Sequence, residues 1–265
     1  MTTTAPVWRI EIDGRPATAE GLLHPALVQT GHFTAMQIRG GRVRGIGHHL
    51  ARLDAATREL FGQELDGERV RGLVRQILRD DITEASVRVH VHAPDGAPSL
   101  MVTVRPPTEL PATMAERAQA LRSVPYQRPF AHIKHLGGFA QARHADLARR
   151  AGFDDALLTG PDGEISEGSV TNIAFFDGTE VVWPSAPHLS GITMRLVEPR
   201  LPAAGLPTRH ARVALADLPS YEAAFVTNAW GVSPVRRIDD TEYGIDEKLM
   251  AQVAGVYEDV PWDTI

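Results

Sequence analysis

Hydrophobic and polar residues alternate in four stretches of the first part of the chain, a pattern that predicts β-strands. These stretches are WRIEIDG, HFTAMQIRGGRVRGI, SVRVHVHA and SLMVTVRP. Between the second and the third, HHLARLDAATRELFG and DGERVRGLVRQILRD place their apolar residues three and four positions apart, which predicts two amphipathic helices. The first part of the chain is therefore predicted to be a small α+β unit.

The rest of the chain is predicted to be a second α+β region with a mostly antiparallel core. FAQARHADLARRAG predicts a helix that ends at Gly152, and a further helix is predicted to begin at Ile192. Short apolar stretches with turn signals at Pro161–Asp162–Gly163 and Asp177–Gly178 predict β-hairpins. The stretch IDEKLMAQVAGVY predicts an amphipathic C-terminal helix.

A stretch with two prolines, SVPYQRPF, separates the two regions and is typical of an interdomain connection. With this boundary, the sequence predicts a small α+β domain over 1–122, a linker over 123–131 and a larger domain over 132–265. A chain of 265 residues is long enough for two such domains with buried cores.

Composition narrows the function classes. The net charge is −6 and no basic run stands out, so we expect no nucleic-acid partner. The chain has no cysteine, which excludes disulfides, thiolate metal sites and thiol catalysis. No apolar run reaches the roughly 20 residues needed to span a bilayer, and MTTTAPVWRIEIDG lacks the features of a signal peptide. We therefore expect a cytoplasmic enzyme without a membrane partner.

Two residues, Lys134 and Lys248, are the only lysines among 27 basic residues. Arginine stays protonated at neutral pH, whereas a lysine amine can lose its proton and attack a carbonyl. One interpretation of Lys134 is therefore a Schiff-base lysine, and the other is a lysine that survives by chance in an arginine-rich composition. Lys248 lies among the polar residues of the predicted C-terminal helix, which indicates a surface residue.

A lysine that binds pyridoxal phosphate needs a carboxylate for the pyridine nitrogen and donors for the phosphate. Glu167 in ISEGSVTN is a candidate carboxylate, and SGITMRL offers a glycine, the Thr193 hydroxyl and a helix start. Arg52 in HHLARL is a candidate phosphate cation. Each also has an ordinary interpretation, as a solvated turn acid, a helix entry and a surface arginine.

Five motifs in this order resemble the class IV aminotransferase family, the fold-type IV enzymes that use pyridoxal phosphate. The resemblance covers about residues 30 to 240 and includes relatives of branched-chain and D-amino-acid aminotransferases and of aminodeoxychorismate lyase. Its motifs are the His-x-x-Arg-Leu pattern at His49, IKHLGGF around Lys134, Glu-Gly-Ser-x-x-Asn from Glu167 to Asn172, LSGITM and VTNAWGVSPV.

The resemblance implies an α+β, two-domain, fold-type IV fold with a larger C-terminal pseudo-barrel domain. It implies that Lys134 holds pyridoxal 5'-phosphate as an internal aldimine and moves the substrate's α-proton, and that Glu167 pairs with the pyridine nitrogen. It also implies a homodimer that acts on an amino acid or keto acid. The phosphate-binding positions that it implies are Arg52, Ile192, Thr193 and Asn228.

Some positions depart from the branched-chain pattern. Phe139 stands where those members carry a tyrosine, and Met194 precedes Arg195 where arginine usually follows the threonine. IKHL, TNA and Thr34 beside Phe33 resemble the lyase branch more. Three functions therefore stay open: an aminotransferase, a lyase of the aminodeoxychorismate type that releases pyruvate, and a non-catalytic relative that binds pyridoxal phosphate.

Substrate binding requires a cation for a carboxylate, and Arg88 in SVRVHVH is the candidate, with Phe33 and Thr34 as further substrate contacts. His90 and His92 could form a metal pair because alternate strand residues share a face. A third ligand is missing, so we expect no metal and two partly exposed histidines instead. The neighbours of the lysine, His132 and His135, either tune the site or pack the loop.

Overall fold

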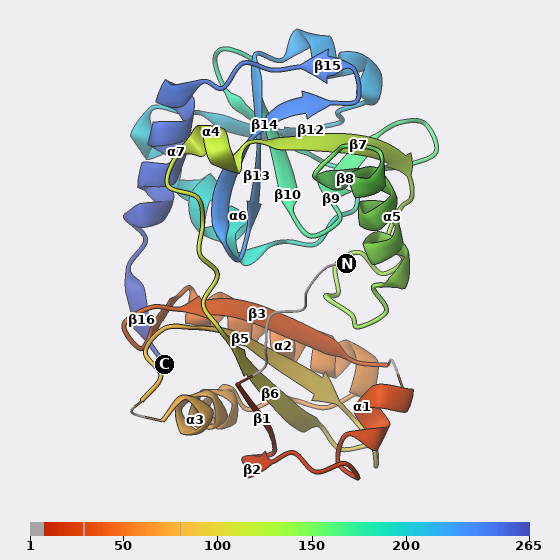
Figure 1. Ribbon diagram of the computed structural model, residues 1–265, viewed down its shortest axis with the longest axis vertical. Helices are drawn as coiled ribbons and strands as arrows, with labels where there is room; N and C mark the ends of the chain where they lie inside the picture. The colour runs from red at the N-terminus through yellow and green to blue at the C-terminus, as the bar shows by residue number, and fades with distance from the viewer. Residues whose placement is uncertain (1–7, 29, 80) are drawn as a thin grey trace. The chain divides into compact units, whose positions relative to one another are not determined.

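The computed structural model describes residues 8–28, 30–79 and 81–265 (Figure 1). Contacts divide the chain into two compact units. Unit 1 comprises Met1–Glu109, Ile133–Gly137 and Pro261–Ile265, and unit 2 comprises Leu110–His132 and Gly138–Val260. The predicted domain bounds of 1–122, 123–131 and 132–265 stay a prediction.

Unit 1 is built on a sheet with the strand order β2-β1-β6-β5-β3, in which every neighbouring pair is antiparallel. A separate pair, β4 and β16, is also antiparallel. The strands are β1 Arg9–Ile12, β2 Arg15–Pro16, β3 His32–Ile38, β4 Arg42–Arg44, β5 Ala85–His92, β6 Ser99–Arg105 and β16 Trp262–Thr264.

Two helices, α2 (Ile46–Phe61) and α3 (Gly67–Leu78), cover one face of this sheet (Figure 1). The other helix of this unit is the short α1 (Leu23–Leu27). We call the covered side the helix face and the opposite side the outer face. Alternate strand residues fill the core on the helix face, as the period of two requires. The core joins Leu53 of α2 and Val74 of α3 to strand residues such as Met36 and Val89.

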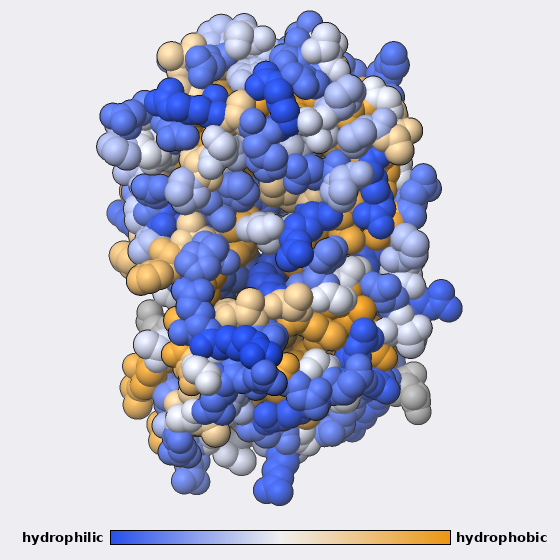
Figure 2. Space-filling model, turned by 180° about the vertical axis from the view of Figure 1, so that it is seen from behind, coloured by the Kyte–Doolittle hydropathy of each residue, from blue (hydrophilic) through white to orange (hydrophobic). Residues whose placement is uncertain are grey.

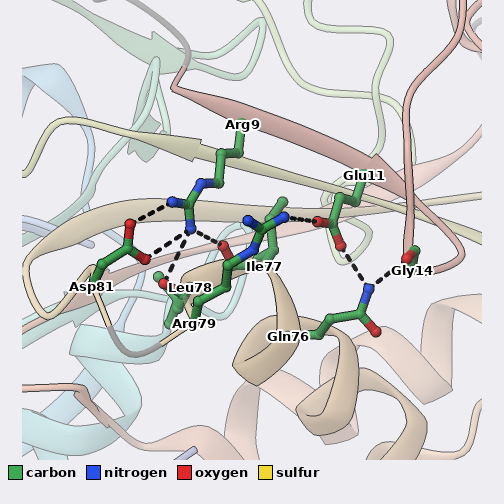
Figure 3. Close-up of polar contacts among 8 residues, drawn as sticks. All are labelled: Arg9, Glu11, Gly14, Gln76, Ile77, Leu78, Arg79 and Asp81. Atoms are coloured by element: carbon green, nitrogen blue, oxygen red, sulfur yellow. Dashed lines mark hydrogen bonds and ion pairs between the residues drawn. The ribbon is translucent and has the colours of Figure 1, made fainter.

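Two charged residues of β1, Arg9 and Glu11, tie the strand to the C-terminal end of α3 (Figure 3). Arg9 donates to the carbonyl oxygens of Ile77 and Leu78 and to the Asp81 carboxylate, and Glu11 lies 3.0 Å from Gln76 and 3.8 Å from Arg79. These carbonyls lie in the last turn of α3, where carbonyl groups lack helical donors, so Arg9 satisfies them. The carboxylate of Glu11 therefore lies on the helix face of the sheet and not on the outer face.

Residues distant in sequence complete unit 1. The segment Ile133–Gly137 runs beside the start of β3: the Phe33 N–H donates to the Lys134 carbonyl at 2.9 Å, and the Leu136 N–H donates to the Gly31 carbonyl at 3.0 Å. The strand β16 pairs with β4. Unit 1 thus contains the backbone of Lys134, which the sequence had placed in the larger domain.

Unit 2 contains a mixed sheet with the strand order β12-β11-β10-β13-β14-β7-β8-β9, to which β15 adds beside β14. Its strands are β7 Gln119–Pro125, β8 Asp155–Thr159, β9 Ile165–Gly168, β10 Asn172–Phe176, β11 Val181–Pro184, β12 Thr208–Ala211, β13 Ala223–Asn228, β14 Gly231–Ile238 and β15 Thr241–Glu242. A bridge between Glu164 and Ala214 links the start of β9 to the segment after β12. The sheet therefore curls back on itself into a half-barrel.

The helices of unit 2 follow its strands and close its cores. They are α4 Met114–Arg117, α5 Phe139–Arg150, α6 Ile192–Val197 and α7 Glu247–Glu258, with 3-10 turns at Glu198–Arg200, Pro202–Ala204 and Leu215–Ser220. One core packs α6 and α7 against Trp183 and Phe225, and another gathers around Phe175 and Leu157. The first core joins strand residues to apolar helix faces, whereas the second consists mainly of strand residues with Leu218 of a 3-10 turn.

The predicted helices and strands are found close to the expected positions. One difference is SVPYQRPF, whose first three residues belong to β7, because their backbone pairs with β8. Within the described residues, no helix is long and apolar enough to cross a membrane. Hydrophilic residues cover most of the face that Figure 2 shows.

Candidate active site

The candidate nucleophile, Lys134, lies on the outer face of unit 1. Its Nζ lies 5.0 Å from the centre of the Phe33 ring, and the ring belongs to an outer-face residue of β3. The side chain is partly buried, and its backbone is fixed by the hydrogen bond from Phe33. The other lysine, Lys248, is exposed on α7, as the sequence predicted.

Arg52 is held by two polar residues inside unit 1. Its Nη2 donates to the Thr34 hydroxyl, and the Thr34 oxygen lies 2.6 Å from His49 Nδ1. A guanidinium can only donate, so Thr34 accepts from Arg52 and donates its own hydrogen to His49. The chain of bonds fixes the orientation of Arg52 from two elements, β3 and α2.

The imidazole of His49 stays neutral in this arrangement. Burial lowers the pKa of His49 well below its usual value, and the positive charge of Arg52 lowers it further. A neutral ring keeps Nδ1 as an acceptor for Thr34. His49 therefore supports Arg52 without adding a charge that would repel it.

Phe33 and Thr34 were both predicted to contact substrate, yet neighbouring residues of a strand point to opposite faces. Phe33 lies on the outer face with Lys134, whereas Thr34 is fully buried on the helix face with His49 and Arg52. Direct contact of Thr34 with substrate stays a prediction. Its bonds in this structure serve Arg52.

Arg88 also lies on the outer face of unit 1. Its guanidinium carbon lies 5.6 Å from the centre of the Phe33 ring, so this ring has Lys134 and Arg88 as cationic neighbours. Burial lowers the pKa of Arg88, and the neighbouring Arg105 lowers it further. The substrate role of Arg88 stays a prediction.

In unit 2, Glu167 is a buried carboxylate with two partners. Arg128 Nη1 donates to Oε1 at 3.0 Å, and the Leu189 N–H donates to Oε2 at 3.2 Å. The side chains of Arg128 and Glu167 are only 4% and 6% exposed. Burial raises the pKa of Glu167, while the charge and the hydrogen bond of Arg128 act in the opposite direction.

The Glu-Gly-Ser-x-x-Asn motif shapes the loop before α6. Two hydrogen bonds fix the backbone of Leu189: its N–H donates to Glu167, and its carbonyl accepts from Asn172 Nδ2 at 2.7 Å. At Gly191, an added Cβ would lie 2.1 Å from Asn172 Oδ1, so no larger residue fits there. The asparagine of the motif therefore positions the loop, and Glu167 is the residue that offers a charge.

The three remaining predicted cofactor residues lie where α6 begins and where β13 ends. Ile192 and Thr193 are buried in the first turn of α6. The Thr193 hydroxyl donates to the Asn228 carbonyl at 2.5 Å, and the Asn228 Oδ1 accepts from the Trp230 N–H at 2.8 Å. These contacts bring Thr193 and Asn228 together within unit 2.

The predicted site residues thus form two sets. Unit 1 holds Lys134, Arg52, Phe33, Thr34 and Arg88, and unit 2 holds Glu167, Ile192, Thr193 and Asn228. A shared phosphate site made from both sets stays a prediction.

Sequence reasoning missed two supporting residues. Arg128 was read as part of a linker, and its partner lies 39 positions away, so only the fold reveals the pair. His49 is the histidine of the His-x-x-Arg-Leu pattern, but its bond to Thr34 depends on how α2 packs on β3. The available signal was chemical: a buried carboxylate requires a cation or N–H donors nearby.

One of the two strand histidines differs from the expectation: His90 is partly exposed, as predicted, but His92 is not. His92 is buried, with 3% exposure, and its ring meets those of His24 and His90. It was expected to be partly exposed, but its neighbours on the outer face cover it. Within 8–28, 30–79 and 81–265, no group of three or more potential ligands could hold a metal ion. His132 is exposed and His135 is half-buried.

This arrangement can be compared with known proteins. Residues 31–238 match the model of the family Amino-transferase class IV, and the chain belongs to this family. The predicted resemblance is therefore confirmed. No curated protein matches the chain by sequence.

Solved structures with low sequence identity share the fold. The branched-chain aminotransferase from Thermoproteus uzoniensis, with norvaline, has a TM-score of 0.82 at 19% identity and covers 96% of this chain and 94% of its own. The 4-amino-4-deoxychorismate lyase from Pseudomonas aeruginosa has a TM-score of 0.79 at 22% identity, and the match covers 95% of this chain and 99% of the lyase. A hypothetical aminotransferase from Mycobacterium tuberculosis, in a PLP-bound form, has a TM-score of 0.80 at 18% identity, and the match covers 96% of this chain and 98% of that one. The fold-type IV fold is confirmed.

Proposed function

We propose that this chain is a pyridoxal-phosphate-dependent aminotransferase of class IV that acts on an amino acid and a keto acid as a homodimer. Family membership supports the class, and relatives with the same fold are aminotransferases or lyases. The observation that carries the proposal is Glu167, a buried carboxylate that Arg128 and a backbone N–H hold in place.

The residues present fit pyridoxal phosphate. Glu167 matches a protonated ring nitrogen, because each of its oxygens accepts a hydrogen bond and has a second lone pair for another donor. Arg52 is oriented by Thr34 and offers further donors to a phosphate. Thr193 adds a hydroxyl in the first turn of α6, next to Asn228 at the end of β13.

In this proposal, each residue has a separate task. The bound cofactor supplies an electron sink for chemistry at the substrate's α-carbon. Lys134 holds the cofactor through its amine and, once released, takes the α-proton on Nζ and returns it. Glu167 pairs with the ring nitrogen, and Arg128 holds its carboxylate in place for that contact. Arg52 anchors the phosphate.

The two lysines provide the test and its control. A protein that holds pyridoxal phosphate as an imine is yellow, and borohydride reduces the imine to a stable bond. Peptide mapping after this reduction should find the cofactor on Lys134 and not on Lys248. Lys134→Ala should remove the visible absorption and turnover, because alanine has no amine. Lys248→Ala should keep both. Labelling of Lys248 alone, or a yellow Lys134→Ala protein, would contradict the proposal.

A screen of amino donors and acceptors then separates the aminotransferase from its relatives. The expected result is transfer of an amine between an amino acid and a keto acid. Release of pyruvate from aminodeoxychorismate without an acceptor would identify a lyase, which is the activity named for one structural relative. Cofactor binding with no turnover of any donor would leave a non-catalytic binding protein.

A further inference from the structure

The outer face of the unit 1 sheet carries no acidic residue within its four longer strands. The register of β1, β3, β5 and β6 defines which residues share this face. They are Ile10, Ile12, Phe33, Ala35, Gln37, Ser86, Arg88, His90, His92, Ser99, Met101, Thr103 and Arg105. The acid of β1, Glu11, lies on the helix face with Gln76 and Arg79 (Figure 3).

Two guanidiniums, Arg88 and Arg105, lie on this acid-free face. Arg105 pairs with Ser86, and Arg88 pairs with Thr103, so the two arginines are diagonal neighbours on adjacent strands. Within the part of the chain that the structure describes, neither has an ion pair or a side-chain hydrogen bond, and the Nε of Arg105 is buried. Two like charges thus lie side by side without a counter-charge.

Other arginines of unit 1 behave differently. Several have a carboxylate within ion-pair distance, namely Arg9 with Asp81, Arg39 with Glu84, Arg58 with Asp54, Arg69 with Asp13 and Arg71 with Glu68. Arg88 and Arg105 have no such carboxylate among the described residues. Their two neighbouring guanidiniums leave charge for an external anion, because anions bind best where several guanidinium donors converge.

A buried hydroxyl completes this group. Thr103 is 7% exposed, and its Oγ1 has no hydrogen-bond partner among the described residues. Thr103 pairs with Arg88 across the strands and shares the outer face with Arg105, two residues along β6. On the other side of Arg88, the paired residue is the small Ala35, and the Phe33 ring lies 5.6 Å from the guanidinium carbon.

Among the strand residues of this face, the charge near neutral pH comes from Arg88 and Arg105. Burial lowers the pKa of His90 to about 3, and Arg88 lowers it further, so this neighbour is neutral. The group of Arg88, Thr103 and Arg105 therefore offers two positive charges and one hydroxyl. Phe33 connects the group to the reactive amine, since its ring lies near both Arg88 and Lys134.

We propose that Arg88, Thr103 and Arg105 form an acidic-substrate subsite, in which Arg88 holds one carboxylate and Arg105 a second, so that the protein selects short dicarboxylic amino and keto acids. The inference rests on the proposed function for the identity of the reacting group. The new element of the inference is Arg105 of β6, which binds the second carboxylate. A second carboxylate neutralises the second guanidinium, whereas a monocarboxylic substrate leaves it unsatisfied.

The kinetic test compares glutamate with 2-aminobutyrate as amino donors. Arg105→Gln should raise the ratio of KM for glutamate to KM for 2-aminobutyrate by roughly 10- to 150-fold, the range for one charge-assisted bond. Arg105→Lys should restore part of the ratio because it keeps the charge. Arg42→Gln, an exposed arginine of β4, is the matched control and should keep the wild-type ratio. An unchanged ratio in Arg105→Gln overturns the proposal.

A binding test works without turnover. Glutarate and butyrate lack the amine, so calorimetric titration of the protein with each measures carboxylate binding alone. Glutarate should bind more tightly than butyrate, and Arg105→Gln should remove that preference. Equal binding of the two acids by the wild type would overturn the subsite. If the protein failed to bind pyridoxal phosphate, the proposed function would fail, while the glutarate titration would still decide on the subsite.

Discussion

Arginine occupies two contrasting settings in this molecule. In unit 2, Arg128 is buried against Glu167 and bonds to the Ala131 carbonyl at 3.0 Å. In unit 1, Arg88 and Arg105 share a face that contains no acid. The first guanidinium has its counter-charge within the fold, and the other two do not. The contrast separates charge that shapes a site from charge that is left for a ligand.

The difference has an energetic basis. Removing one partner of a buried pair leaves an unsatisfied charge in a low-dielectric setting, which is strongly destabilising. Removing one of two neighbouring like charges relieves repulsion and leaves nothing unpaired. The same substitution should therefore have opposite consequences for folding in the two units.

The largest expected effect tests this contrast directly. Arg128→Met should lower the free energy of unfolding by about 3–5 kcal/mol, because Glu167 keeps its burial and loses its cation. Arg105→Met should change it by no more than about 0.5 kcal/mol. Denaturant unfolding of the two variants measures both values. The double variant Arg128→Met/Glu167→Gln should recover part of the loss, and equal losses in the two single variants would break the comparison.

Lowering the pH should affect the stability of the two units differently. His32 of unit 1 is buried, and its Nε2 lies 3.0 Å from Thr57 Oγ1, which already donates to the Leu53 carbonyl. Nε2 must therefore carry the hydrogen of this bond. Burial lowers the pKa of His32 to about 4, with smaller effects from His92 and Arg52.

A lowered pKa in the folded state means that the unfolded chain binds the proton first. The contribution of His32 is complete above pH 6.5 and is lost as the pH falls towards about 4, a loss of about 3 kcal/mol. In unit 2, burial raises the pKa of Glu167 and Asp155, so protonation of these acids does not oppose folding in the same window. Unfolding of the wild type and His32→Asn between pH 7 and pH 4 measures the slope. A variant that keeps the wild-type slope would remove His32 from this explanation.

The smallest expected effect compares charged and neutral donors to the proposed phosphate. Arg52→Ala should weaken pyridoxal phosphate by roughly 10- to 150-fold, and Thr193→Val by less, because a neutral bond contributes roughly 0.5–1.5 kcal/mol. Pyridoxal without phosphate should bind the wild type and Arg52→Ala alike. Titration of cofactor-free protein with both compounds measures the difference. Equal weakening of both compounds would make Arg52 a folding residue.

The sequence predicted the elements of unit 1 well because alternation along β3 and β5 is strong and local. Lys134 as the Schiff-base lysine stays a prediction, and the signal behind it, two lysines among many arginines, is chemical and needs no fold. The opposite faces of Phe33 and Thr34 follow from the period of a strand alone and could have been predicted.

Other features depend on contacts between distant segments. The pairing of Arg128 with Glu167 depends on the order β7-β8-β9 in the unit 2 sheet, and the proximity of Arg88 to Arg105 depends on the register of β5 and β6. The prediction also placed Lys134 in the larger domain, while its backbone pairs with the start of β3. Such pairings leave no periodic pattern in the sequence.

The way the chain completes unit 1 affects its synthesis on the ribosome. The Ile46 N–H at the start of α2 donates to the carboxylate of Asp263, 217 positions later, and β4 pairs with β16. While the N-terminal sheet emerges, neither partner has been translated. Unit 1 therefore cannot reach its final form during the early part of elongation, although its strands are made first. The nascent chain has to wait for β16, and until then β4 has an open edge that a chaperone can cover.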